Sequence, residues 1–141
     1  MSLDYKNLVV WQRADDLFIE IHRLTHQRFP AEERSELGSQ MRRAALSVPS
    51  NVVEGNARRS HREKLRFFNI ASASLSELTY GLHAAHRLAY IDESEYQRLD
   101  DLARMVAAPL YGLIRRERKQ LVVKAAVCLA LAVAIAVPAL A

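Results

Sequence analysis

Basic side chains are concentrated in two short stretches of this 141-residue chain. Residues 58–66 hold five Lys or Arg against one Glu, and residues 115–119 hold four against one. Lys and Arg are the side chains that most often contact phosphate oxygens of nucleic acids, so both stretches are candidate phosphate-binding sites. With a smaller pair upstream, the candidate residues are Arg42, Arg43, Arg58, Arg59, Arg62, Lys64, Arg66, Arg115, Arg116, Arg118 and Lys119.

Both stretches also have explanations that require no nucleic acid. Positive charge near the C-terminus of a helix complements the helix dipole, which accounts for residues 115–119 equally well. The arginines of residues 58–66 can pair instead with an acidic residue such as Glu54 of a neighbouring copy. No aromatic residue interleaves that cluster, so stacking on bases is not expected and any binding should have little sequence preference. The net charge of +4 and the pI near 9.5 permit an anionic partner without requiring one.

Residues that could support catalysis or bind a metal are few. The sequence has no glycine-rich phosphate loop and no motif that places Ser, His and Asp together. His22 and His26, like His83 and His86, have a spacing that puts two imidazoles on one helical face, but without a suitably spaced carboxylate they are expected to be surface residues. The single Cys128 excludes an internal disulfide and a Cys-based zinc site. We therefore expect a cytoplasmic protein that is not an enzyme and has no metal or cofactor.

Apolar residues recur at spacings of three and four over most of the chain, as in amphipathic helices. Only four Gly and four Pro occur, which favours helices over sheets. The connections between the apolar seams are short, so successive helices should be antiparallel neighbours. The predicted fold is all-α: an antiparallel up-down-up-down four-helix bundle in residues 1–120, followed by an apolar C-terminal tail in residues 121–141. The predicted helices cover residues 8–28, 37–55, 61–88 and about 94–119.

Polar residues, glycine and proline mark the predicted helix boundaries and bends. Ser60 followed by Glu63 has the spacing of a capping box, so the third helix should begin after Ser60. Gly55, with the Asn that follows it, suits a left-handed stop to the second helix. Pro49 should bend that helix, as Pro109 should bend the fourth. The other predicted N-terminal caps are Ser35 for the second helix and Asp92 or Ser94 for the fourth.

The tail, residues 121–141, differs in kind from the rest of the chain. Lys124 is its only charged residue. Leu, Ile and Val contribute roughly −0.3 to −0.6 kcal/mol each to membrane insertion, while Lys124 and Pro138 subtract from that gain, so insertion is close to break-even. We expect a helical tail that packs with other copies of the chain. The alternative is a membrane anchor that holds the bundle at the cytoplasmic face of the inner membrane.

The third predicted helix carries more apolar surface than one partner helix can cover. Phe67, Ile70, Ala71 and Ala73 widen its apolar face near the start. Small residues between positions 71 and 76 would let the backbone of a neighbouring helix come close. Since exposed apolar patches of this kind mark protein interfaces, we expect a homo-oligomer.

Several separated motifs resemble those of one protein family. They are LVVWQRA at residues 8–14, Phe29-Pro30, SQMRRAA at 39–45, SVPSNVVEG at 47–55 and SLSEL at 74–78. The set resembles the four-helix-bundle family named for proteins encoded in intervening sequences of bacterial 23S ribosomal RNA genes, which includes relatives of the accessory variability protein of diversity-generating retroelements. The resemblance covers about Tyr5 to Lys119 and leaves the tail out. Ala73 and Ala89 stand where many relatives have Gly.

The resemblance implies assembly into a ring of five copies. It also implies a basic surface for RNA or DNA and, in the retroelement branch, for a reverse transcriptase. Function in most of the family is poorly defined, so the resemblance predicts the fold more firmly than the activity. Together with the basic stretches, it leads us to expect a non-enzymatic pentameric scaffold that binds RNA or DNA. The alternative is a structural or protein-interaction ring with no nucleic-acid role.

Overall fold

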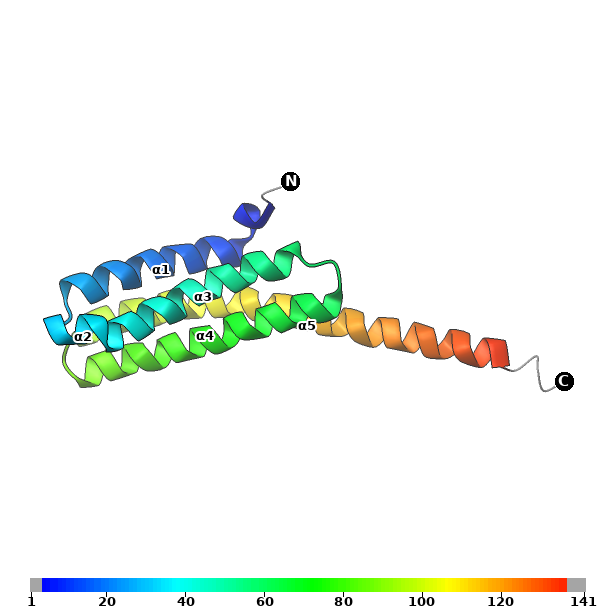
Figure 1. Cartoon of the computed structure of the whole chain (residues 1–141). Coiled ribbons are helices and arrows are strands. Elements are labelled where there is room, and N and C mark those ends of the chain that lie inside the picture. The colour runs from blue at the N-terminus through cyan, green and yellow to red at the C-terminus, as the bar shows by residue number, and fades with distance from the viewer. Residues whose placement is uncertain (1–3, 137–141) are drawn as a thin grey trace.

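The computed structural model describes residues 4–136, and every regular element in this range is a helix. The elements are a 3-10 helix η1 (Asp4–Asn7) and the α-helices α1 (Val9–Gln27), α2 (Ala31–Ser35), α3 (Leu37–Ala57), α4 (His61–Arg87) and α5 (Glu93–Ala136). Figure 1 shows α1, α3, α4 and the first part of α5 side by side as a bundle, with the rest of α5 extending beyond it. The all-α prediction is confirmed, and the first three predicted helices agree with α1, α3 and α4 to within two residues at each end.

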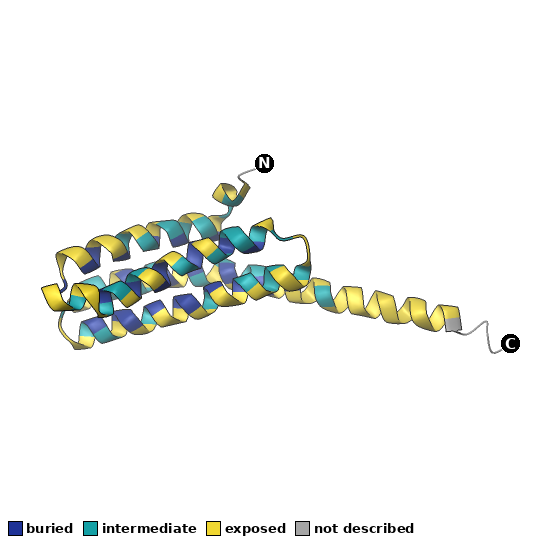
Figure 2. Cartoon of the chain, in the orientation of Figure 1, coloured by how far each residue is buried: buried dark blue, intermediate teal, exposed yellow. Residues whose placement is uncertain are grey.

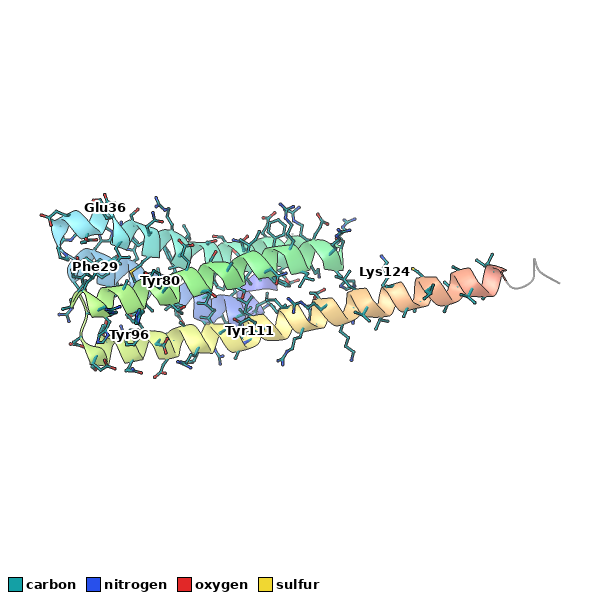
Figure 3. The ribbon with its side chains drawn as sticks, turned by 90° about the horizontal axis from the view of Figure 1, so that it is seen from below. Phe29, Glu36, Tyr80, Tyr96, Tyr111 and Lys124 are labelled. Atoms are coloured by element: carbon teal, nitrogen blue, oxygen red, sulfur yellow. The ribbon has the colours of Figure 1, made fainter. Side chains whose placement is uncertain are left out.

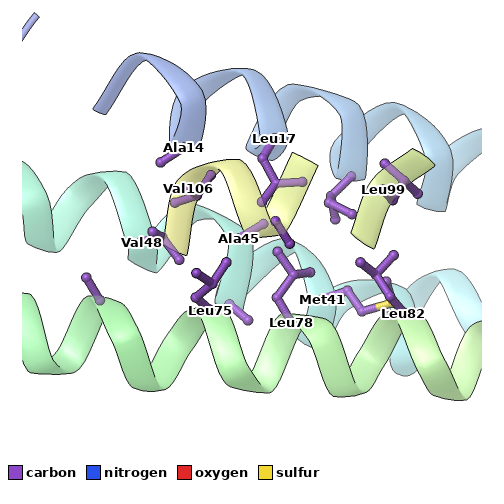
Figure 4. Close-up of a cluster of buried hydrophobic side chains, with 14 of the residues drawn as sticks. Ala14, Leu17, Met41, Ala45, Val48, Leu75, Leu78, Leu82, Leu99 and Val106 are labelled. Atoms are coloured by element: carbon purple, nitrogen blue, oxygen red, sulfur yellow. The ribbon is translucent and has the colours of Figure 1, made fainter. Parts of the chain in front are cut away.

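The core of the bundle is formed by one apolar stripe from each long helix. Figure 2 shows buried residues on the inward sides of the helices and exposed residues on the outward sides. Burial of each Leu or Met side chain in such a core contributes about 1.5–3 kcal/mol. The buried residues labelled in Figure 4 are Ala14, Leu17, Met41, Ala45, Val48, Leu75, Leu78, Leu82, Leu99 and Val106.

The 3.6-residue spacing of apolar residues predicts a seam of Trp11, Ala14, Phe18, Ile21 and Leu24 or Thr25 in α1, and the buried stripe differs slightly from it. Val10 and Leu17 are fully buried, whereas Trp11 and Phe18, which the seam included, are only partly buried against the core. The stripe is therefore turned by about one residue from the prediction. Trp11 instead packs edge-on against Tyr5 of η1, with ring centroids 5.1 Å apart.

Close packing of α3 against α4 explains two glycines. A Cβ on Gly55 would lie 2.6 Å from Cε1 of Phe68, and a Cβ on Gly81 would lie 2.7 Å from Cγ of Met41. Gly55 does not have a positive φ, and α3 continues past it to Ala57. The predicted left-handed stop at Gly55 is therefore wrong, and this glycine makes room for an aromatic ring instead.

Side chains cap α4 and α5 at their N-termini. The Ser60 hydroxyl accepts the N–H of Glu63 at 3.1 Å, which confirms Ser60 as the predicted N-terminal cap of α4. Asp92 caps α5, because its Oδ1 accepts the N–H of Glu95 at 2.8 Å. Ser35 does not cap α3. It is the last residue of α2, a helix where only a connection was expected, and its hydroxyl donates to a carbonyl within α2.

The longest helix, α5, has 44 residues and continues through Pro109. Beyond Gln120 it runs on without support from the bundle, so its apolar side chains, including Val122, Leu129 and Ile135, are exposed. The tail is thus a continuation of α5 as far as it is described. Proline removes a backbone N–H and is expected to end or kink a helix, but Pro138 lies outside the described residues. Among residues 4–136, no helix is long and apolar enough to cross a membrane.

Candidate nucleic-acid interface

The two basic stretches of the sequence meet at one end of the bundle. Residues 58–66 lead into and form the start of α4, and residues 115–119 belong to α5 where it leaves the bundle (Figure 1). Nδ1 of His61 lies 2.6 Å from Oε2 of Glu117, so the two stretches are in direct contact. We call the surface formed by residues 54–66 and 115–119 the basic end.

Glu117 is the buried residue around which the basic end is built. Its side chain is only 2% exposed. One carboxylate oxygen accepts from His61, and the other accepts from Nε and Nη2 of Arg116 at 3.1 and 3.0 Å. Burial by itself would raise the pKa of Glu117. The hydrogen bonds from His61 and Arg116 and the charges of Arg116 and Lys64 together lower this pKa by more than burial raises it, so the net shift is downward. Glu117 is therefore an ionised carboxylate at neutral pH.

Sequence reasoning missed Glu117 because it lies among four basic residues and was counted only as an interruption of their charge. A signal was present in the spacing. Leu110 and Ile114 are buried seam residues of α5, and Glu117 follows at the next step of three along the same stripe. A charged residue at a seam position should be buried with partners, which is what the structure shows.

Charge is distributed unevenly along the bundle. The basic end holds nine Lys or Arg and three Glu, a net of +6, whereas the whole chain is +4, so all other residues together are −2. Glu32 and Glu33 of α2 lie at the opposite end, near the turn between α4 and α5. There, burial and Glu33 raise the pKa of Tyr90, and its ring packs 5.3 Å from that of Phe29. The positive charge of the bundle is thus concentrated at one end, and acidic residues lie at the other.

Several of the predicted phosphate-binding residues are exposed at the basic end. They make no ion pair with any residue that the structure describes, so their charges face solvent. These residues are Arg59, Arg62, Arg66, Arg115, Arg118 and Lys119. Arg116 is also exposed, but its guanidinium is committed to Glu117.

The structure places Arg42 and Arg43 away from the basic end. Arg42 is half-buried, and its guanidinium donates to the Thr25 hydroxyl at 3.0 Å and to the Arg34 carbonyl at 2.9 Å, so it holds α1, α2 and α3 together. Arg43 is exposed on α3 but precedes Arg58 by 15 residues, which is roughly 20 Å along a helix. Neither residue extends the basic end.

An aromatic ring lies against the basic cluster, although no aromatic residue interleaves the cluster in the sequence. The guanidinium carbon of Arg58 lies 5.0 Å from the centre of the Phe67 ring, and that of Arg66 lies 5.9 Å from it. Arg58 also pairs with Glu54 of its own chain, where the sequence had suggested a neighbour's Glu54. Arg58 and Phe67 are thus held within the fold, and Arg58 is not among the groups free to bind phosphate.

A groove opens between α4 and α5 beside the basic end. It has a volume of about 520 Å³, and Figure 3 shows Tyr111 on α5 where this helix runs alongside α4. Tyr111 is 49% exposed, and Arg115 and Arg118 follow it on the same side of α5 at steps of four and three residues. The residues that line the groove are Asn69, Ser72, Ala108, Tyr111, Ile114, Arg115 and Arg118.

The histidine pairs show no arrangement for a metal. Within residues 4–136, no group of three or more His, Cys, Asp or Glu side chains is placed to hold an ion. His22 and His26 are exposed with ring centroids 4.7 Å apart, as surface residues would be. His86 differs from the prediction of a solvated residue, because it is half-buried, stacks on Tyr96 and lies 3.0 Å from a carboxylate oxygen of Glu93.

These observations define a small all-α protein built as a bundle of four long helices, with strong positive charge at one end. The chain belongs to the family of 23S rRNA-intervening sequence proteins, whose family model matches residues 6–112. A crystal structure of a protein of unknown function from the S23 ribosomal protein family of Bacteroides thetaiotaomicron has a similar fold, with a TM-score of 0.70 and 21% identity over 75% of this chain and 98% of that one. No curated protein matches the chain. The family match ends before residues 115–119, so the second basic stretch and the tail lie beyond it.

Proposed function

We propose that this protein is a non-enzymatic, homo-oligomeric scaffold that binds RNA or DNA through its basic end. The observation that carries the proposal is the contact between His61 and Glu117, because it joins two basic stretches into one surface with a net charge of +6. Exposed Lys and Arg side chains on such a surface attract phosphates and release the counterions condensed on a nucleic acid. An ordinary solvated surface would be expected to mix its charges, as the remainder of this chain does.

The test is the salt dependence of binding in a variant with three exposed basic residues replaced by Gln. The variant is Arg59→Gln, Arg62→Gln and Lys119→Gln in the full chain. Each phosphate contact contributes about 0.7–0.9 to the slope of log affinity against log salt concentration, so losing three contacts should flatten the slope by about 2–3. Fluorescence anisotropy of a labelled RNA and a labelled DNA duplex, titrated at several salt concentrations, measures this slope.

A matched control removes the same charge elsewhere. Arg23, Arg28 and Arg87 are exposed and do not belong to the basic end, so their replacement by Gln lowers the net charge equally. This control should keep the slope of the parent protein. If both triple variants and the parent bind identically, the basic end is a solvated surface or an interface between proteins, and the alternative of a structural ring without a nucleic-acid role is favoured.

The oligomer that we propose forms through α3 and α4, with a second copy of the chain as the occupant of this face. Tyr80 of α4 is 72% exposed beside a groove of about 220 Å³, and Ile70 is exposed nearly three turns further back on the same helix. The groove is lined by Leu37, Gln40, Met41, Glu77, Tyr80 and Gly81. A ring of five copies, each an up-down-up-down bundle, is the arrangement that the family resemblance implies.

Light scattering of the full chain should give a mass several times that of one copy. Tyr80→Lys places a charge on the exposed face and should lower the mass without unfolding the bundle, because this side chain is mostly outside the core. Gln97→Lys, at an exposed position of α5, is the control and should leave the mass unchanged. A parent protein that is monomeric at micromolar concentration contradicts the oligomer but not the binding surface.

A further inference from the structure

The two walls of the groove between α4 and α5 are formed by different kinds of side chain. The wall from α4 consists of small polar residues, Asn69 and Ser72, and a second, smaller groove continues it past Ser76 and Thr79. The wall from α5 carries an aromatic ring, Tyr111, which lines both grooves. Together they form a trough that runs from the basic end along the bundle.

The charged groups of the main groove are all positive. Arg115 and Arg118 line it, and no carboxylate does. Neither arginine forms an ion pair within the part of the chain that the structure describes, and Asn69 is exposed. The floor is apolar, since Ile114 is buried beneath these side chains. A flat apolar body with an attached anion would therefore match the groove.

From this arrangement we infer that the groove holds an unstacked nucleotide of a single-stranded nucleic acid. The base lies on the ring of Tyr111, the Asn69 amide faces the base edge, and the flanking phosphates contact Arg115 and Arg118. Single-stranded nucleic acids are commonly bound in this way, by aromatic rings that stack on bases and a basic groove that follows the backbone. A volume of about 520 Å³ is within the range of roughly 300–1,000 Å³ that small-ligand pockets span.

This inference rests on the proposed function, and it adds a preference for single strands that the basic end alone would not create. Phosphate contacts act on single strands and duplexes alike, whereas a paired base is stacked within its helix and cannot reach Tyr111. The chain should therefore bind a single strand more tightly than a duplex with the same number of phosphates in reach. A surface that attracts nucleic acid by charge alone, with no ring in the groove, predicts no such preference.

The experiment compares Tyr111→Leu and Tyr111→Phe with the parent protein in the full chain. The probes are a labelled 12-nucleotide oligouridylate and a labelled 12-base-pair RNA duplex at one fixed salt concentration. Leu removes the ring and Phe keeps it, and both fit a side chain that is half exposed. Loss of a stacked base should weaken oligouridylate binding by roughly tenfold in Tyr111→Leu, with Tyr111→Phe close to the parent and duplex binding unchanged in both.

Three results overturn the inference, and the first two are distinguishable from failure of the proposed function. If Tyr111→Leu binds oligouridylate like the parent while the basic-end triple variant binds it weakly, the basic end binds nucleic acid but the groove does not hold a base. If Tyr111→Leu lowers the mass measured by light scattering, the groove is an interface between copies. If the parent binds neither probe at low salt, the proposed function fails and the groove inference fails with it.

Discussion

Replacing Glu117 by Gln should lower the free energy of unfolding by about 1–2 kcal/mol at pH 7. Each of the two carboxylate oxygens is hydrogen-bonded, one by His61 and the other by Arg116. Hydrogen bonds to a charged group contribute roughly 1.5–3 kcal/mol each. The side chains of His61 and Arg116 are 40% and 62% exposed, however, so they regain water when the charge is lost, and the neutral amide is easier to bury. Both effects reduce the expected loss below the sum of these contributions, to about 1–2 kcal/mol.

The pH dependence of stability gives an independent check on the same carboxylate. Because its pKa in the folded protein lies below the ordinary value of 4.5, Glu117 binds a proton more weakly in the folded protein than in the unfolded chain. Its contribution is therefore complete above about pH 4.5 and is lost as the pH falls through the folded-state pKa. Between pH 7 and pH 3, the free energy of unfolding should fall further in the parent than in Glu117→Gln.

Urea unfolding followed by circular dichroism at 222 nm measures both effects, at one protein concentration because the chain is expected to associate. Asp101→Asn, an exposed position on the same helix, is the control and should stay within about 0.5 kcal/mol of the parent. The reasoning is refuted if Glu117→Gln is as stable as the parent at pH 7 and shows the same fall toward pH 3. In that case the contact between His61 and Glu117 would not hold the two basic stretches together.

Three further changes test the packing and the tail. Ala89→Gly should stabilise the protein by about 0.5–1 kcal/mol in thermal unfolding, because Ala89 has a φ of 58°, a conformation that Gly adopts without strain. Gly55→Ala should destabilise it by about 1–3 kcal/mol, because the new Cβ would overlap the Phe68 ring, whereas Gly112→Ala has open space and should be neutral or stabilising. A chain ending at Gln120 should stay soluble on cell fractionation, as should the full chain if its tail packs with other copies. A full chain that stays in the membrane pellet after a high-salt wash would favour the anchor instead.

The helices were predictable from the sequence because their signals are local. Apolar spacing of three and four, and the Ser60 and Glu63 capping box, depend only on residues a turn or two apart. Gly55 was misread because the reason for it lies on another helix, in the ring of Phe68. Glycine at the end of an apolar seam looks the same whether it turns the backbone or makes room for a neighbour.

The basic end was only partly predictable for the same physical reason. The positions of the arginines were evident, but whether each of them is free depends on partners distant in sequence, such as Thr25 for Arg42. The contact between His61 and Glu117, which joins the two basic stretches, is also between residues distant in sequence. Tyr111 escaped notice because it precedes the second basic stretch by a full turn and joins it only on a helical surface. Contacts between helices, rather than any motif, assemble the site.

The number of free basic residues sets an upper limit on the salt dependence of one copy. The structure leaves six of the nine exposed and unpaired at the basic end, since Arg58 pairs with Glu54, Arg116 pairs with Glu117 and Lys64 is half-buried. Six phosphate contacts on duplex DNA correspond to a slope of about −5 in log affinity against log salt concentration. One copy acting alone cannot exceed that value. A steeper slope in the parent, falling to about −5 or less in Tyr80→Lys, would show that several copies of an oligomer bind the same nucleic acid, whereas an equal slope in both would mean that each copy binds independently.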